Sequence, residues 1–168
     1  RSNDLEQLTP WFSDFIQKQN LFFHHSGHTA NSPVASELLS VPDKYSTNMG
    51  MAPISHYPEL FKPIDIGIVP LNNIPFNHAK SYIKGLEYAA AGIPFISSYS
   101  PEYQYLAENG IGRIATNQQE WERHLEDLLD ANTRIAEIKS NYEQLDKFSI
   151  GARGNDWDET FRIILEQK

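Results

Sequence analysis

Two lysines, Lys80 and Lys84, lie four residues apart at the start of a helix that the sequence predicts over 79–91. At this spacing they repel each other by about 0.2–0.5 kcal/mol, and cations near a helix N-terminus oppose its dipole by about 0.3–1 kcal/mol. A bound anion reverses both penalties, because the two ammonium groups and the N–H groups at the helix start then face negative charge. The pattern therefore predicts a phosphate site.

Glu87 follows these lysines on a neighbouring stripe of the same helix. It could accept hydrogen bonds from sugar or ribose hydroxyls while the lysines hold a diphosphate. In the alternative, Lys84 and Glu87 form an ordinary (i, i+3) surface pair and Lys80 is solvated, since such pairs are common and contribute little energy. The residues alone leave both interpretations open.

The elements that must position these residues alternate between strands and helices. Short apolar segments predict strands at 21–25, 45–49, 64–69, 94–98 and 112–116. Helices are expected over 4–19, 79–91 and 102–109, and again from 117 onward. This alternation predicts an α/β fold, with a Rossmann-like, doubly wound parallel sheet and helices on both faces. Ligands of such sheets bind beyond the carboxyl ends of the strands, in the loops 26–32, 50–56, 70–78 and 97–102.

Helical periodicity indicates which side chains should be buried. The face of the 79–91 helix that should pack on the sheet carries Ala79, Ile83, Leu86 and Ala90.

The C-terminal part of the chain is expected to be helical, with residues 131–168 packing back on the domain. Asn117 and Glu120 resemble a capping box at its start. Gly151 and Gly154 should break the helical run before a last helix, and Trp121 and Trp157 are expected to be core anchors.

Composition excludes several classes of function. The chain of 168 residues is expected to form one domain, and its net charge of −8 disfavours binding to nucleic acid or to anionic membrane surfaces. It has no cysteines, which removes disulfides and thiolate metal sites and fits a cytoplasmic location. No apolar run approaches the roughly 20 residues needed to cross a bilayer, so no transmembrane segment is expected.

Three histidines, His24, His25 and His28, are spaced like metal ligands. Neighbouring residues of a strand point to opposite faces, so at most two of these side chains could share an ion. We therefore expect no metal site.

The segment Phe76–Pro94 resembles the nucleotide-binding half of GT-B glycosyltransferases, within the retaining group that has a Glu–seven residues–Glu signature. Its run is Phe-Asn-x-Ala-Lys-Ser-x-x-Lys-x-Leu-Glu-Tyr-Ala-Ala-x-Gly-x-Pro. The strand 64–71, the short helix 57–60, the strand 95–98 and the turn 109–112 also fit this resemblance, which covers about residues 4–130.

The resemblance implies a donor-binding role for Lys80, Ser81, Tyr82, Lys84, Glu87, Gly50, Met51, Ala52, Asn77, His25 and His28. Glu87 stands at the second glutamate of the signature, which contacts the donor's ribose, while Ala79 replaces the first glutamate. In the family, the backbone N–H groups at the helix start approach the diphosphate, and this position is occupied here by Lys80, Ser81 and Tyr82. The loop after Gly50 corresponds to the base cradle, and the loop of His25 and His28 faces the donor cleft.

The resemblance further implies hexosyl transfer from a nucleotide-diphosphate sugar, without a metal or another cofactor. In such enzymes this half begins with one more strand and is joined to an N-terminal acceptor-binding domain. Neither is expected in this chain, so it should bind a nucleotide weakly and transfer nothing by itself. Two other classes remain open: a sugar-nucleotide epimerase of related fold, and a non-catalytic interaction domain with a doubly wound sheet.

Overall fold

The computed structural model describes residues 2–27 and 33–166, and within them the chain is α/β. The five strands are β1 (Phe23–His25), β2 (Ser46–Asn48), β3 (Gly67–Val69), β4 (Phe95–Ser98) and β5 (Arg113–Ala115). The α-helices are α1 (Trp11–Lys18), α2 (Ala35–Leu38), α3 (Pro75–His78), α4 (Ile83–Ala90), α5 (Pro101–Glu108), α6 (Gln118–Leu129), α7 (Ala131–Leu145) and α8 (Ile150–Glu166). Four 3-10 segments complete the described part: η1 (Ser2–Leu8), η2 (Asp43–Tyr45), η3 (Ile54–Phe61) and η4 (Asp146–Phe148).

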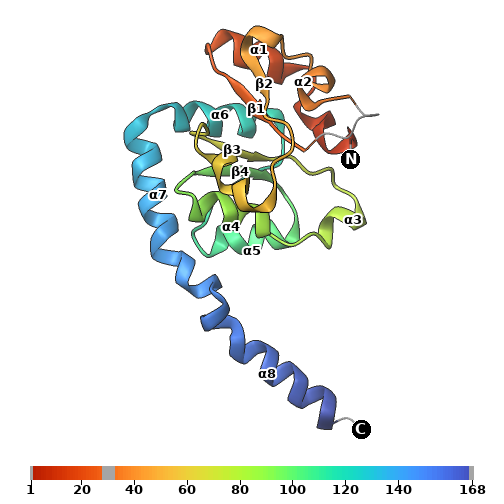
Figure 1. The fold of residues 1–168 in the computed structure, drawn as a ribbon, viewed down its shortest axis with the longest axis vertical. Helices are drawn as coiled ribbons and strands as arrows, with labels where there is room; N and C mark the ends of the chain where they lie inside the picture. The colour runs from red at the N-terminus through yellow and green to blue at the C-terminus, as the bar shows by residue number, and fades with distance from the viewer. Residues whose placement is uncertain (1, 28–32, 167–168) are drawn as a thin grey trace.

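All strand pairs are parallel, as predicted, but they form two sheets (Figure 1). One sheet has the order β1-β2 and the other the order β3-β4-β5. In the second sheet, Gly67 is opposite Phe95 and Ile96 is opposite Arg113. The expectation of a single sheet of five strands is therefore wrong for the described residues.

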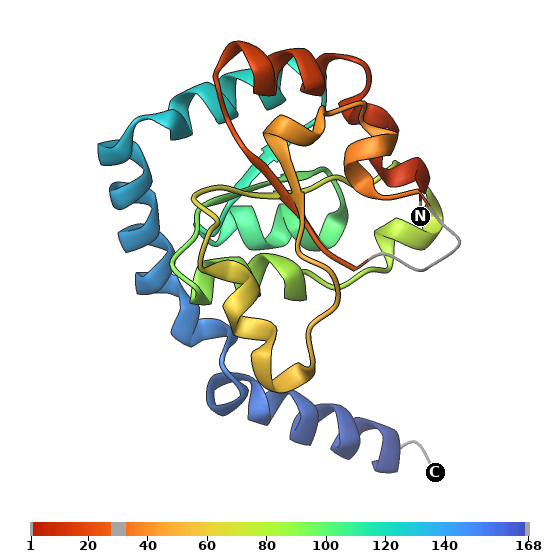
Figure 2. The same cartoon turned by 45° about the horizontal axis from the view of Figure 1, so that its top comes forward.

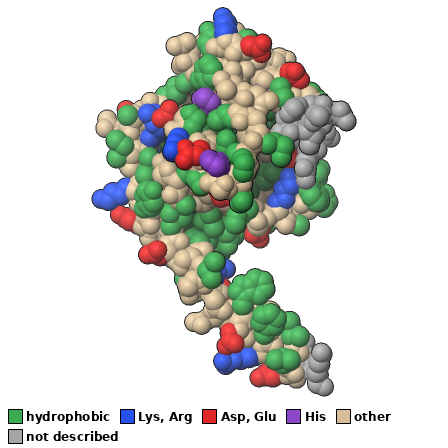
Figure 3. Space-filling model, viewed as in Figure 1, with side chains coloured by type: hydrophobic (Ala, Val, Ile, Leu, Met, Phe, Trp, Pro, Cys, Tyr) green, Lys and Arg blue, Asp and Glu red, His purple; other side chains and the backbone are tan. Residues whose placement is uncertain are grey.

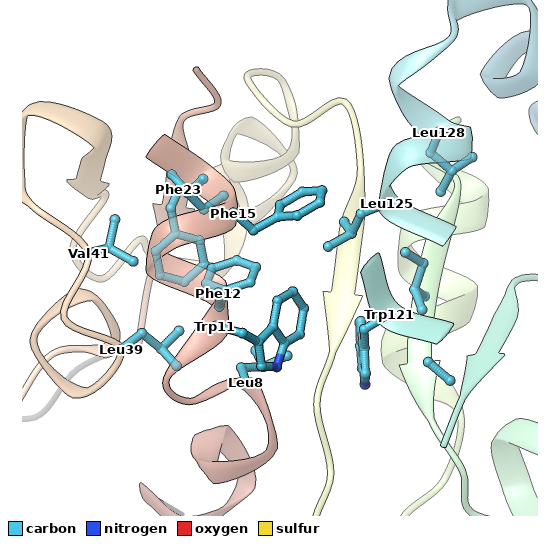
Figure 4. Packing of buried hydrophobic residues seen from close by; sticks show 13 residues of the cluster. Leu8, Trp11, Phe12, Phe15, Phe23, Leu39, Val41, Trp121, Leu125 and Leu128 are labelled. Atoms are coloured by element: carbon cyan, nitrogen blue, oxygen red, sulfur yellow. The ribbon is translucent and has the colours of Figure 1, made fainter. Parts of the chain in front are cut away.

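The three-stranded sheet has helices on both faces. Phe95 of β4 packs with the side chains of α4 and α5, whereas its neighbour Ile96 packs with those of α1 and α6. Figure 4 shows the second of these layers, in which aromatic residues of α1 face Trp121, Leu125 and Leu128 of α6. Trp121 is 1% exposed and is the core anchor that its helical spacing predicted.

The first predicted helix is divided in two. Pro10 lacks a backbone N–H, and the α-helix begins only after it, at Trp11, while residues 2–8 form a 3-10 segment. At the start of α6 the prediction holds, because Asn117 accepts a hydrogen bond from the N–H of Glu120.

The helix predicted over 79–91 starts later and buries a different face. The short helix α3 precedes it, and α4 begins only at Ile83, whose side chain is 61% exposed. Gly85 and Ala89 are the buried positions of α4. A Cβ atom at Gly85 would lie only 2.7 Å from Cζ of Phe95, so the helix approaches the sheet along its glycine. Periodicity of large apolar residues gave the wrong face for this reason.

The C-terminal helices behave in two ways. α7 packs against α4 and α6, whereas α8 projects away from the rest of the described residues (Figures 1 and 2). Gly151 and Gly154 lie inside α8 and do not interrupt it. Trp157 is 68% exposed, so it is not a core anchor, and Figure 3 shows hydrophobic side chains exposed along this helix.

Replacing Trp157 with serine should change the free energy of unfolding by less than about 0.5 kcal/mol, because the side chain loses little burial. Urea unfolding of the parent and the variant measures this difference. A loss of several times that amount would mean that α8 packs on the domain in solution.

Within residues 2–27 and 33–166, no helix combines the length and the apolar character that crossing a membrane requires.

Candidate functional site

Two cavities lie near the carboxyl ends of the strands, and Lys84 lines both. The first, which we call the lysine cavity, has a volume of about 290 Å³ and lies where β3 ends and α4 begins. Its lining residues are Val69, Leu71, Lys80, Ser81, Ile83, Lys84 and Tyr103. Lys80, Ser81 and Lys84, three of the predicted site residues, therefore share one cavity.

The second cavity, which we call the histidine cavity, also has a volume of about 290 Å³ and lies at the ends of β1 and β2. Aromatic rings of η3 and α4 form part of its wall. Its lining residues are His24, His25, Ser26, Gly27, Met49, Tyr57, Leu60, Phe61, Ile64, Lys84 and Tyr88. Lys84 therefore lies between the two cavities, and its Nζ lies 5.0 Å from the centre of the Tyr57 ring, which belongs to the wall of the histidine cavity.

The ammonium group of Lys80 already has a carboxylate partner. Lys80 Nζ donates to Asp4 Oδ2 at 2.9 Å, and the two side chains are 33% and 18% exposed. Asp4 Oδ1 also accepts from the N–H of Asn72 at 3.1 Å and from Asn77 Nδ2 at 2.5 Å. Burial alone would raise the pKa of Asp4, but the hydrogen bonds from Lys80, Asn72 and Asn77 outweigh it and lower the pKa below 3.8. Asp4 therefore remains ionised at neutral pH.

Lys84 and Glu87 form the (i, i+3) ion pair that the alternative interpretation of the sequence expected. Lys84 Nζ donates to Glu87 Oε2 at 2.6 Å and also to the hydroxyl of Tyr57, which itself donates to Glu87 Oε2 at 2.9 Å. Burial would lower the pKa of Lys84, but hydrogen bonds to Glu87 and Tyr57 raise it above 10.5. The lysine is therefore fully charged at neutral pH.

The backbone at the start of α4 offers donors to the lysine cavity. Tyr82 is the N-cap residue, and its own side chain caps no backbone group. Among the described residues, the N–H of Lys80 donates to the carbonyl of Asn77 at 3.2 Å, and the next N–H with an internal acceptor is that of Gly85, which donates to the carbonyl of Tyr82 at 2.9 Å. The first N–H groups of a helix have no intrahelical partner, so those near Ser81 are suited to an anion.

Asn77 lies outside both cavities. It is 1% exposed, and its Nδ2 donates to Asp4 and to the carbonyl of Asn72 at 2.8 Å. This side chain holds α3 and the loop before it against η1. These contacts are those of a positioning residue, and a direct contact of Asn77 with a donor stays a prediction.

The described site residues that were predicted in the loops after β1 and β2 do not line the lysine cavity. His25 lines the histidine cavity, where its Nε2 lies 3.0 Å from Ser36 Oγ. The Gly50 carbonyl accepts from Ser26 Oγ at 2.7 Å, while Met51 is exposed and neither it nor Ala52 is among the residues that line the two cavities. His28 lies outside the described residues.

No group of three or more His, Cys, Asp or Glu side chains in the described part of the chain is arranged to hold a metal ion.

Comparison with known proteins finds no matching family model and no matching curated sequence. The chemistry of the site therefore has to be inferred from its own residues.

Sequence reasoning missed two residues that matter here, Asp4 and Tyr57. Asp4 reaches Lys80 across 76 positions of the sequence, and Tyr57 reaches Glu87 across 30. Neither contact follows from local spacing. The available signal was the pair of neighbouring lysines, Lys80 and Lys84. If such cations are buried or half-buried they require partners, so carboxylate or hydroxyl partners could have been expected for both.

Replacing Asp4 with asparagine should lower the free energy of unfolding by about 1–2 kcal/mol at neutral pH, because Lys80 loses its partner. The folded-state pKa of Asp4 is below 3.8, so its stabilisation is complete above that value and is lost as the pH falls below it. The difference between parent and variant should therefore be constant near neutral pH and shrink as the pH falls through the folded-state pKa of Asp4. Urea unfolding from neutral pH to below this pKa measures it, and a difference that stays constant throughout would contradict the lowered pKa.

Proposed function

We propose that this chain is the donor-binding domain of a GT-B glycosyltransferase, with a Rossmann-like, doubly wound architecture, and that it binds a nucleotide-diphosphate sugar. The observation that supports the proposal best is the convergence of Lys80, Ser81 and Lys84 on one cavity at the end of β3. Two lysines and the start of a helix meet there, in a chain of net charge −8. Each ammonium group has a carboxylate partner, Asp4 for Lys80 and Glu87 for Lys84, with which a bound diphosphate would compete.

In this proposal the diphosphate lies in the lysine cavity. Transfer of a hexosyl group breaks the bond between the sugar and the diphosphate, which leaves with extra negative charge. Lys80, Lys84 and the backbone amides near Ser81 stabilise that charge without a protein-bound metal. The same contacts hold the diphosphate leaving group in position. The acceptor hydroxyl would be held by a separate acceptor-binding domain.

The nucleoside would then occupy the histidine cavity on the other side of Lys84. The rings of Tyr57, Phe61 and Tyr88 line that cavity and suit the flat face of a base. Glu87, held beside the cavity by Tyr57 and Lys84, would accept a hydrogen bond from a ribose hydroxyl.

Titration with UDP and with GDP tests this function, with uridine and guanosine as controls that lack phosphate. One of the diphosphates should raise the melting temperature, because a ligand at 100 times its dissociation constant stabilises a protein by about 2.7 kcal/mol. The free nucleosides should have a much smaller effect. If no nucleotide shifts the melting temperature at millimolar concentration, the proposal fails.

The two alternatives give different results in the same experiment. A non-catalytic interaction domain would show no shift with any nucleotide. A sugar-nucleotide epimerase would bind the nucleotide but would also convert a nucleotide sugar without an acceptor, and it needs a carboxylate and a histidine around the sugar. His25 lies near Ser36, and the carboxylate of Glu87 is engaged by Lys84 and Tyr57, so this arrangement favours the transferase.

A further inference from the structure

Phe76, the second residue of α3, is a large aromatic side chain that the fold leaves in solvent. It is 71% exposed, whereas the next residue, Asn77, is 1% exposed. The Asn77 side chain is fixed by hydrogen bonds to Asp4 and to the carbonyl of Asn72, so α3 cannot rotate to bury Phe76 without breaking them. In Figures 1 and 2, α3 and α7 lie on opposite sides of the domain, so α7 does not cover this ring.

The ring of Phe76 lies beside the lysine cavity. Lys80 Nζ is 5.4 Å from the centre of the ring, and Lys80 lines that cavity. Two further apolar side chains of this region are accessible: Ile83 in the cavity wall is 61% exposed, and Ile74, the N-cap of α3, is 43% exposed. Single exposed apolar side chains are common, but several beside one cavity are typical of a ligand-binding groove.

The two lysines give the site a direction. Lys84 lines both cavities, and its Nζ is close to the ring of Tyr57 in the histidine cavity. Lys80 lines only the lysine cavity of these two, and its Nζ is close to the ring of Phe76. A ligand whose nucleoside occupies the histidine cavity therefore passes Lys84 first and Lys80 second. The sugar of a nucleotide-diphosphate sugar is bonded to the far end of the diphosphate, so it lies at the Phe76 end.

The chemistry of the ring suits a sugar at this end. A hexose ring presents C–H bonds on its faces and hydroxyl groups around its edge. The face of an aromatic ring is negative and attracts the weakly positive hydrogens of C–H groups. A cation over one face of an exposed ring contributes little energy and occupies that face alone, so the rest of the Phe76 ring is open to a ligand.

We propose that Phe76 is the platform on which the hexose of the donor stacks, and that it therefore determines how much the sugar contributes to binding. The inference rests on the proposed function, to which it adds the sugar subsite. The nucleoside and the diphosphate lie on the other side of Lys80. The ring of Phe76 thus adds affinity for the nucleotide sugar and none for the nucleoside diphosphate.

The test is the ratio of two dissociation constants, that of the nucleoside diphosphate divided by that of the matching nucleotide sugar. Isothermal titration calorimetry gives it for UDP with UDP-glucose and UDP-galactose, and for GDP with GDP-mannose. Phe76→Ala should lower this ratio by about 3- to 10-fold for at least one donor and leave the dissociation constant of the diphosphate unchanged. The exposed position of Phe76 means that the variant should fold like the parent, which a thermal melt checks.

Two variants serve as controls. Phe76→Tyr keeps the ring face and should keep the ratio of the parent. Phe161→Ala removes a phenylalanine that is 58% exposed on α8 and lines neither cavity, so it should also bind like the parent.

The failures of the two proposals can be distinguished. If the parent binds neither UDP nor GDP, the proposed function fails and the sugar subsite fails with it. If the parent binds one of them, the subsite alone is overturned by a ratio that Phe76→Ala leaves unchanged for all three donors. It is equally overturned if Phe76→Ala weakens the diphosphate and the nucleotide sugar alike, because the ring then supports Lys80 and does not contact the sugar.

Discussion

Replacing Gly112 with alanine is expected to lower the free energy of unfolding by about 2–4 kcal/mol. Gly112 has φ +76°, and a Cβ atom there would lie 2.3 Å from Cζ of Phe95. Phe95 cannot move away easily, because it is 1% exposed and packs between Tyr88 and Tyr103. Backbone strain of about 1 kcal/mol therefore adds to the cost of overpacking. Urea unfolding measures the sum.

Gly110 provides a matched control two residues away. Its φ is +82°, and its Cβ would lie 3.4 Å from Cγ of Gln144, the flexible part of a side chain. Gly110→Ala should therefore cost only about 1 kcal/mol, from the same backbone strain. Both replacements change the unfolded state alike, so the difference between them measures the clash with Phe95. Equal losses would mean that the ring of Phe95 does not lie against Gly112.

Replacing Lys84 with methionine is expected to weaken nucleoside-diphosphate binding by about 10- to 100-fold. A charge-assisted hydrogen bond to phosphate contributes about 1.5–3 kcal/mol, and methionine retains most of the aliphatic side chain while removing the charge. Lys84 is the lysine that lines both cavities, so its loss affects the diphosphate wherever it lies along them. Isothermal titration calorimetry with UDP and GDP gives the dissociation constants.

Lys62→Met is the matched control for that experiment. Lys62 forms an (i, i+3) ion pair with Glu59, as Lys84 does with Glu87, but its side chain is 70% exposed and lines neither cavity. It should bind nucleotides like the parent. If Lys84→Met also binds like the parent, the lysine cavity does not hold the diphosphate.

The parts of the fold that depend on local signals could be predicted from the sequence. The five strands occur where short apolar segments end at loops, and Asn117 caps α6 as its spacing indicated. Trp121 is buried because it begins the apolar stripe of α6, a helix packed on the core.

The predictions that were wrong concern features that depend on packing between residues far apart in the sequence. Hydrophobic periodicity counts a glycine as neutral, yet Gly85 lies against Phe95 and so decides which face of α4 is buried. Periodicity likewise treats Trp121 and Trp157 alike, although α8 has no partner among the described residues that buries its apolar side. For the site, the two lysines were predicted to lie at one cavity, but the carboxylate of Asp4 could not be anticipated from spacing.

The carboxylate of Asp4 acts as an internal competitor for the ammonium group of Lys80. An anion that takes the place of Asp4 at Lys80 also breaks the contacts of Asp4 with Asn72 and Asn77 if the carboxylate moves away, so its measured affinity is the intrinsic affinity reduced by the cost of this exchange. Because Asp4 belongs to η1, displacement also removes the contact of this segment with the loop before α3. If the proposed diphosphate takes the place of Asp4 at Lys80, its binding and the docking of this segment are linked equilibria, and each weakens the other by the same factor.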